Sequence, residues 1–394
     1  MTIPARATAA TRFVLPAELS AAEPAEARGS ARDEVRLLVA RADRPVAHRR
    51  FRDLPAALAP GDLVVVNTSP TAPAAVDGLR SPAAPWPRPE RDRPAAGMQS
   101  APGGTRRGAH SAPGGTRPVV VHVSGPVPGG AADELVVELR SPAGGRVRDG
   151  AAGERIALPG RVTATLLAGH PDPAIRTGSR LWRARLDVPG GPGRWLERVG
   201  RPISYSYLRG RWPIEAYQTV FAQPVRHGEL PSAEMPSAGR PFTRGVLDGF
   251  AARGIGVAEI VLHTGVSSLE ADEVPLPERY RVPVATADAV NAARARAGRI
   301  IAVGTTVTRA LETVTGPDGV VRAGAGWTDL VLGPDRPARA ADGIVTGWHE
   351  PEASHLLLLE AVAGPDLVGR AYAAALEHGY LWHEFGDSCL LLRV

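Results

Sequence analysis

Two parts of the chain, residues 1–74 and 199–394, alternate short apolar runs with segments that carry apolar residues every three or four positions. Short runs bounded by turn residues are typical of buried strands, and the wider spacing is typical of helices. Strands that alternate with helices predict an α/β domain with a largely parallel sheet covered on both faces. The predicted strands are 34–40, 62–67, 256–265, 299–306, 327–333 and 388–394, and the predicted helices are 51–62, 241–254, 286–299, 307–314, 355–364 and 365–379.

The part between them, residues 75–198, has a different pattern. Short runs with alternating apolar and polar positions follow one another, separated by Gly and Pro turns, at 119–125, 134–140, 154–160, 161–169 and 179–189. Short, closely spaced strands without intervening helices are typical of a barrel or a sandwich. We therefore expect a small all-β domain, either a barrel or a sandwich, over 75–198, inserted into an α/β domain formed by 1–74 and 199–394.

One segment, Ser81 to Pro118, lacks periodic apolar residues. It is rich in Pro, Gly, Ser and Arg, and the string SAPGGTR begins at Ser100 and again at Ser111. Such a composition buries too little apolar surface to offset the entropy of ordering. The sequence predicts a disordered, arginine-bearing segment inside the all-β domain.

Composition excludes several chemistries. The chain of 394 residues has 46 basic residues, all of them arginine, so it cannot form the lysine Schiff bases or lysine phosphate contacts of many enzymes. A single cysteine, Cys389, excludes an internal disulfide, a multi-cysteine zinc site and an iron–sulfur cluster. The net charge of +5 permits a polyanionic partner without requiring one.

No apolar stretch approaches the roughly 20 residues that a membrane helix needs. The first residues, MTIPARATAATRFVLP, also lack the apolar centre of a secretory signal. We expect a cytoplasmic monomer that does not interact with membranes.

The first candidate site lies where a predicted strand meets a predicted helix. Gly304, Thr305 and Thr306 follow the run RIIAV and precede VTRALETV, which contains Arg309. A turn there directs backbone N–H groups and the positive helix end beyond the carboxyl end of the strand, where anions and polar ligands bind. The alternative is an ordinary capped helix, with a threonine as the cap.

A second candidate is the loop PSAEMPSAGRPFT, residues 231–243. Small residues such as Gly239 let a backbone approach a ligand closely. Glu234 has the chemistry of a general base, Arg240 that of an anion clamp and Phe242 that of a stacking face. Each of these side chains also has a plain surface or capping role as its alternative.

Histidines with neighbouring carboxylates form the remaining candidates. His263 ends a predicted strand, His349 lies beside Trp348, and His383 lies close to Asp387. Histidine at an element boundary is suited to acid–base work. The histidine spacing fits no zinc pattern, so we expect no metal.

Taken in order, these strings resemble the S-adenosylmethionine:tRNA ribosyltransferase-isomerases of queuosine biosynthesis. The resemblance covers nearly the whole chain, apart from Ser81 to Pro118 and most of the β module, and rests on the strings HRRFRDLPAALAPGDLVVVN, YQTVFA, PSAGRPFT, LHTGV, RIIAVGTTVTRALE, DGIVTGWHEP and FGDSCLLL.

The resemblance implies an α/β domain carrying an inserted β-barrel. It also implies a transferase and isomerase that takes S-adenosylmethionine as co-substrate, without a metal, and modifies tRNA. In this family a base removes the ribose C5′ proton beside the sulfonium, the amine of 7-aminomethyl-7-deazaguanine in tRNA drives rearrangement, and epoxyqueuosine remains after adenine and methionine leave.

The implied site divides into two groups. Acid–base roles fall to His263 or Glu234, with His349 and Asp387 across the cleft. Residues near the donor are Gly239, Phe242, Gly304, Thr305, Thr306, Arg309 and Trp348.

The chain departs from the family at polar positions. It has NTSPTAPAA at 67–75 where the family has NDTRVIPAR, and Pro241 where the family has a histidine. These departures keep two alternatives open: a paralogous S-adenosylmethionine-dependent enzyme with a non-tRNA acceptor, and an inactive RNA-binding protein.

Overall fold

Central strands of the sheet bury both of their faces. In the computed structural model, which describes residues 8–81, 116–226, 228–266, 275–351 and 353–393, β3 (Leu63–Asn67) is buried along its whole length. Its residues Leu63 and Val65 belong to one apolar cluster, and Val64 and Val66 to the other. A strand that is apolar on both faces requires a covering layer on each side.

The sheet has nine strands in the order β13-β11-β10-β3-β12-β14-β15-β1-β2. Its centre is parallel, because β3 pairs in parallel with β10 and β12, and β12 pairs in parallel with β14; β15 also runs parallel to β1. The expected largely parallel core is confirmed; β14 and β15 pair in antiparallel, so β15 and β1 run opposite to the central four strands, and further antiparallel strands extend the sheet at both edges. The strands are β1 (Arg36–Arg41), β2 (Ala47–Arg50), β10 (Gly256–His263), β11 (Glu278–Val282), β12 (Ile300–Val303), β13 (Gly324–Thr328), β14 (Gly343–Thr346) and β15 (Ser388–Leu392).

Helices cover both faces. One apolar cluster packs α4 (Val284–Ala295), α5 (Gly304–Thr313), α6 (Ser354–Ala363) and α7 (Pro365–Glu377) against the sheet. The other packs α1 (Leu54–Ala57) and α3 (Arg244–Ala252) against the opposite face. Within the described part of the chain, none of these helices has the length and apolar character to span a bilayer.

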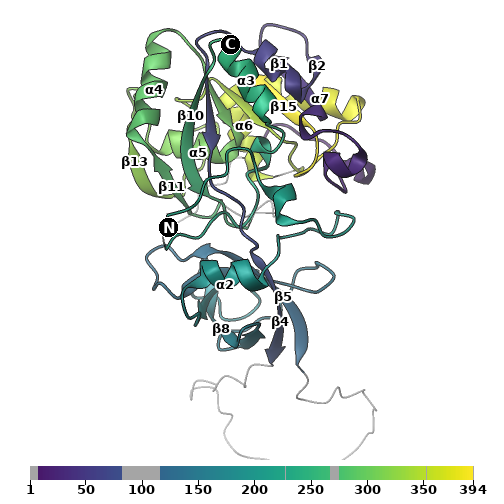
Figure 1. The fold of residues 1–394 in the computed structure, drawn as a ribbon, viewed down its shortest axis with the longest axis vertical. Helices are drawn as coiled ribbons and strands as arrows, with labels where there is room; N and C mark the ends of the chain where they lie inside the picture. Colours follow the sequence, from purple (N-terminus) through teal and green to yellow (C-terminus); the bar gives the residue numbers. More distant parts are fainter. Residues whose placement is uncertain (1–7, 82–115, 227, 267–274, 352, 394) are drawn as a thin grey trace, which may run out of the picture.

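Six antiparallel strands close into a barrel between β3 and β10 in the sequence, as expected. Figure 1 shows the barrel at one end of the molecule, with the sheet and its helices at the other. The helix α2 (Pro192–Val199) packs Trp195 and Leu196 against the barrel interior. The barrel strands are β4 (Ala75–Ser81), β5 (Arg117–Pro126), β6 (Glu134–Arg140), β7 (Arg155–Leu158), β8 (Val162–His170) and β9 (Leu181–Leu186).

The ends of the segment predicted to be disordered are strand. Arg80 pairs with Arg117, and Leu79 pairs with Pro118, so the β4–β5 hairpin includes Ser81, Arg117 and Pro118. The prediction was wrong there because backbone hydrogen bonds between paired strands order these residues, although they lack apolar periodicity. Residues 82–115 lie outside the described part. The domain limits at 75 and 198 stay a prediction.

Candidate active site

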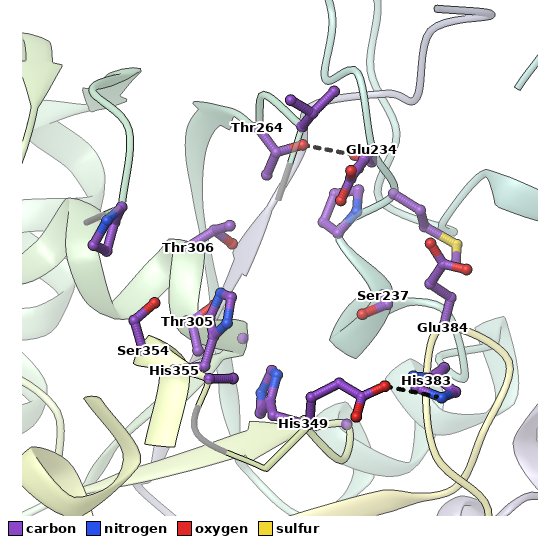
Figure 2. Close-up of a pocket in the computed structure, with 18 of the residues that line it drawn as sticks. Glu234, Ser237, Thr264, Thr305, Thr306, His349, Ser354, His355, His383 and Glu384 are labelled. Carbon is purple, nitrogen blue, oxygen red and sulfur yellow. Dashed lines mark hydrogen bonds and ion pairs between the residues drawn. The ribbon is translucent and has the colours of Figure 1, made fainter. Parts of the chain in front are cut away.

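A cavity of about 660 Å³ opens at the carboxyl ends of the parallel strands β10, β12 and β14. This is the edge at which open α/β sheets bind ligands. The barrel contributes Arg140 and Arg146 to its lining, so the cavity is bounded by both parts of the fold. Figure 2 shows Thr305, Thr306 and His355 on one side of this space and Glu234, Ser237 and Glu384 on the other.

The amino-terminal end of α5 forms part of the cavity wall. Gly304 has a φ of 88°, in the left-handed region, and this turn lets the chain pass directly from β12 into the helix. No side chain caps α5, which contradicts the alternative of a threonine cap. Because the first N–H groups of a helix have no intrahelical partner, this end offers hydrogen-bond donors and a positive field to a ligand. Gly304, Thr305 and Thr306 all line the cavity, as the sequence predicted for a ligand-facing turn.

Replacing Gly304 with alanine is expected to lower the free energy of unfolding by about 1–2 kcal/mol, the cost of placing an L-residue in the left-handed region. An added Cβ would also lie 3.2 Å from Ala238 Cβ. The matched control is Gly369→Ala in α7, where an added Cβ meets nothing within 4 Å. There alanine should raise the free energy of unfolding by about 0.5–1 kcal/mol. Urea unfolding of both variants checks the opposite signs, and equal effects would contradict this reading of Gly304.

Glu234 is fixed from two sides. Thr264, just beyond β10, donates its hydroxyl to the Glu234 backbone carbonyl at 2.6 Å. The Tyr205 hydroxyl donates to Glu234 Oε1. The side chain is 9% exposed and lines the cavity. A carboxylate held in this way is suited to general-base chemistry on a bound ligand.

Three histidines line the same cavity. The rings of His349 and His355 stack with centroids 4.7 Å apart, and His349 Nε2 lies 2.9 Å from the Thr346 hydroxyl. Burial lowers the pKa of His349 well below its ordinary value, and burial with the nearby charge of Arg309 lowers the pKa of His355 to about 4. Burial also lowers the pKa of His383 to about 4. All three imidazoles are therefore neutral near pH 7 and able to accept a proton or a hydrogen bond.

Glu384 is a cavity residue that the sequence analysis did not select. The Tyr207 hydroxyl donates to its Oε2 at 2.7 Å. Burial and the nearby Glu234 carboxylate raise the pKa of Glu384 to about 8. Its position beside His383 in the string HEFGDSC was the available signal. Tyr205 and Tyr207 were missed because residues 200–212 carry neither a helical nor a strand period.

Arg309 and Trp348 line the cavity, but contacts with other groups of the protein fix both side chains. The Arg309 guanidinium pairs with Glu278 and donates to the carbonyls of Leu276, Thr328 and Leu330. Trp348 is 2% exposed, with its ring perpendicular to that of Tyr372. Both side chains shape the wall of the cavity.

His263 lies outside this cavity. It faces a smaller one of about 30 Å³, on the other side of the strand end. Its Nδ1 lies 2.8 Å from the Ser69 hydroxyl and its Nε2 lies 3.5 Å from Glu229. Burial lowers the pKa of His263, and the Glu229 carboxylate opposes that shift. Two protein partners thus engage both ring nitrogens, so the structure separates His263 from the other predicted acid–base groups.

Phe242 and Gly239 also lie away from the cavity. The Phe242 ring is fully buried and packs edge-on against Phe51 and Phe221 in the core. An added Cβ at Gly239 would face Thr219 at 3.3 Å, so this glycine allows close packing within the protein. The structure therefore brings neither of them to the predicted donor site.

Asp387 likewise has structural contacts with the rest of the protein. It is 5% exposed, and its carboxylate accepts from the backbone N–H groups of Arg36 and Leu381 at 2.7 and 2.8 Å. The Arg36 guanidinium pairs with the same carboxylate at 2.8 Å. These bonds join β1 to the loop that carries His383 and Glu384. Arg240, the predicted anion clamp, pairs with Glu26 at 2.8 Å and is 2% exposed.

The polar lining contains no ready metal site. Within the ranges that the structure describes, no three His, Cys, Asp or Glu side chains are grouped to hold a metal ion. The arrangement instead combines hydrogen-bond donors at a helix end, neutral imidazoles and the two acidic side chains Glu234 and Glu384. Such a cavity suits acid–base chemistry on a polar organic ligand.

This chain is similar to known proteins over most of its length. A family model described as queuosine biosynthesis protein matches residues 8–86 and 131–391. The S-adenosylmethionine:tRNA ribosyltransferase-isomerase of Symbiobacterium thermophilum is 33% identical, over 96% of this chain and 98% of the relative. The protein of the same name from Acidiphilium cryptum is 34% identical, over 97% and 98%. A crystal structure of S-adenosylmethionine tRNA ribosyltransferase from Thermotoga maritima aligns with a TM-score of 0.47 at 23% identity, over 97% of this chain and 99% of that one.

A polar cavity at the carboxyl edge of an α/β sheet, lined in part by an inserted barrel, is a common type of ligand site in enzymes. The family match covers well over half of the chain, and the relatives match nearly all of it. The chain belongs to the S-adenosylmethionine:tRNA ribosyltransferase-isomerase family of queuosine biosynthesis.

Proposed function

We propose that this protein transfers the ribosyl group of S-adenosylmethionine to 7-aminomethyl-7-deazaguanine in tRNA and isomerises it to epoxyqueuosine, releasing adenine and methionine. The observation that carries the proposal is the 33% identity, over 96% of the chain, with the S-adenosylmethionine:tRNA ribosyltransferase-isomerase of Symbiobacterium thermophilum. The cavity of about 660 Å³ is within the usual range for sites that hold a nucleoside-sized ligand.

Glu234 is the base in this proposal. The sulfonium acidifies the adjacent ribose C5′, and a carboxylate in the cavity takes that proton. His349 lies in the same cavity as a neutral imidazole, which allows it to hydrogen-bond a ribose hydroxyl. The backbone N–H groups at Thr305 and Thr306 donate hydrogen bonds to polar groups of S-adenosylmethionine, and Trp348 supplies an apolar wall of the cavity.

The acceptor requires contact with tRNA. Arginine is suited to phosphate because its planar guanidinium forms paired hydrogen bonds. The chain has a net charge of +5, and it contains arginine but no lysine. Arg146 of the barrel lines the cavity. We place the tRNA backbone along the barrel side of the cavity. We further propose that the enzyme works as a monomer in the cytoplasm, where tRNA is modified.

Product analysis tests the function. Purified protein is incubated with S-adenosylmethionine and tRNA that carries 7-aminomethyl-7-deazaguanine, and free adenine, methionine and the tRNA nucleosides are quantified. We expect adenine and methionine in equal amounts and epoxyqueuosine in the tRNA. Release only when cell extract supplies another acceptor would favour the paralogous enzyme, and tRNA binding without any release would favour the inactive RNA-binding protein.

A further inference from the structure

His383 lines the cavity with a backbone conformation that residues other than glycine rarely adopt. Its φ is 73°, in the left-handed region. In the described part of the chain, Arg161 and Ala297 share this feature, but neither of them lines the cavity. Placing a residue with a Cβ atom in this region lowers the folding equilibrium constant by about fivefold or more. Backbone strain of this kind persists where it positions a functional group.

Backbone hydrogen bonds fix the chain on both sides of His383. The preceding residue, Trp382, donates its N–H to the Leu19 carbonyl at 2.7 Å. The Trp382 carbonyl accepts from the N–H of Ala21 at 3.1 Å. The carbonyl of His383 itself accepts from the N–H of Gly386 at 3.0 Å. The left-handed turn is therefore imposed by its surroundings, among them the segment near the amino terminus.

Side-chain contacts orient the imidazole of His383. One face stacks on the Tyr207 ring, with centroids 4.2 Å apart and planes 15° from parallel. The Nε2 atom lies 3.1 Å from the Ser20 hydroxyl and 3.6 Å from a carboxylate oxygen of Glu350. Among the residues that the structure describes, the other ring nitrogen, Nδ1, has no hydrogen-bond partner, and it is not sealed from solvent. The ring is thus held in place with one nitrogen left for a ligand, on the same side of the cavity as Glu384 (Figure 2).

The surroundings of Nε2 decide which ring nitrogen carries the proton. Burial lowers the pKa of His383 to about 4, so near pH 7 the ring is neutral and has a single N–H group. An ionised carboxylate only accepts hydrogen bonds, and a serine hydroxyl is able to accept one. A proton on Nε2 therefore satisfies Glu350 and Ser20 together. Nδ1 then carries a lone pair and is an acceptor for a ligand.

We propose that His383 is a specificity-determining residue whose Nδ1 accepts a hydrogen bond from a neutral N–H or O–H group of S-adenosylmethionine, and that Ser20 is its positioning residue. This inference rests on the proposed function, which supplies that substrate. The neutral donors of S-adenosylmethionine are the exocyclic amine of adenine and the two ribose hydroxyls. All of them share the chemistry that Nδ1 recognises, and the experiment separates them.

Calorimetry without tRNA tests the contact, because no acceptor is then present for turnover. Binding of S-adenosylmethionine is compared with that of S-inosylmethionine, which has a carbonyl in place of the amine, and with its 2′-deoxy and 3′-deoxy counterparts. We expect the native protein to bind S-adenosylmethionine about tenfold more tightly than the counterpart that lacks the donor facing Nδ1, since that acceptor is then left unpaired. The donor is identified as the group whose removal weakens binding to the native protein but not to His383→Gly.

Three variants probe the acceptor and its orientation. His383→Gly suits the left-handed backbone and removes the acceptor, so the preference should fall to within about twofold of unity. His383→Asn also tolerates this backbone, and its Oδ1 stands as many bonds from the main chain as Nδ1, so at least about threefold should remain. Ser20→Ala should reduce the preference to about threefold and leave binding of the counterpart without the donor unchanged. The matched control, Ala297→Gly, relieves the same backbone strain outside the cavity and should discriminate like the native protein.

The inference is overturned if the native protein binds all the counterparts as tightly as S-adenosylmethionine, or if His383→Gly keeps every native preference. It is also overturned if His383→Asn discriminates no better than His383→Gly. These results leave the proposed function standing wherever product analysis finds epoxyqueuosine. A preference that His383→Gly loses and His383→Asn keeps supports the contact even where no product forms, and the absence of product would then count against the proposed function alone.

Discussion

The Glu234→Gln variant is expected to lose between about a hundredfold and ten-thousandfold in kcat, the usual contribution of a positioned general base. Glutamine retains an oxygen that can accept from Tyr205, and the backbone anchor through Thr264 does not involve the side chain. The substitution therefore removes the proton acceptor and leaves the cavity wall in place. Release of adenine from S-adenosylmethionine in the presence of modified tRNA measures kcat.

The matched comparison is His263→Gln. This imidazole lies in the smaller cavity, between Ser69 and Glu229, so its loss should lower kcat by less than about tenfold. Circular dichroism of both variants verifies that they are folded. If His263→Gln is the inactive variant and Glu234→Gln keeps its rate, the base assignment fails and the other predicted base, His263, takes its place.

The Asp387→Asn variant is expected to lose about 3 kcal/mol in the free energy of unfolding, the range for breaking a buried, hydrogen-bonded ion pair. An amide cannot accept from all the donors that now meet the carboxylate, which are two backbone N–H groups and the Arg36 guanidinium. Urea unfolding followed by circular dichroism measures the loss.

The matched control is Asp335→Asn at an exposed position, which should change stability by no more than about 0.5 kcal/mol. Turnover measured beside stability distinguishes a structural role of Asp387 from the catalytic role that the sequence predicted for it. If Asp387→Asn unfolds at the same urea concentration as the native protein and yet loses turnover, the carboxylate acts in catalysis.

Strands that bury both faces were predictable because their apolar runs are continuous. The run DLVVVN gave β3, and RIIAV gave β12. The strand predicted over 327–333 was wrong beyond residue 328, because β13 covers Gly324–Thr328. Three other strands of the sheet were not predicted from their patterns. β2 is the polar edge strand AHRR, β11 is the partly exposed ERYRV, and β14 has only four residues. Pairing with a neighbour, and not apolar periodicity, makes these segments strands.

The candidate site was predictable where it coincides with an element boundary. Gly304, Thr305 and Thr306 line the cavity because a parallel strand ends there and a helix begins. Residue type and position in a loop or at an element boundary brought His349 and Glu234 into consideration, and both line the cavity. Residue type alone misplaced Phe242, since an aromatic ring serves a core as well as it serves a ligand.

Local sequence by itself determined that this chain forms an α/β sheet interrupted by a small all-β domain, because the period of apolar residues is a local property. It also determined the chemistries that a chain without lysine and with one cysteine lacks. Only the tertiary structure decided which polar groups share a cavity. Tyr205 and Glu234 are 29 residues apart in sequence, Tyr207 and Glu384 are 177 apart, and only the folded chain brings each pair into hydrogen-bond contact. Tertiary contacts likewise engage His263 with Ser69 and Asp387 with Arg36, because a side chain at a strand end faces whatever element packs next to it.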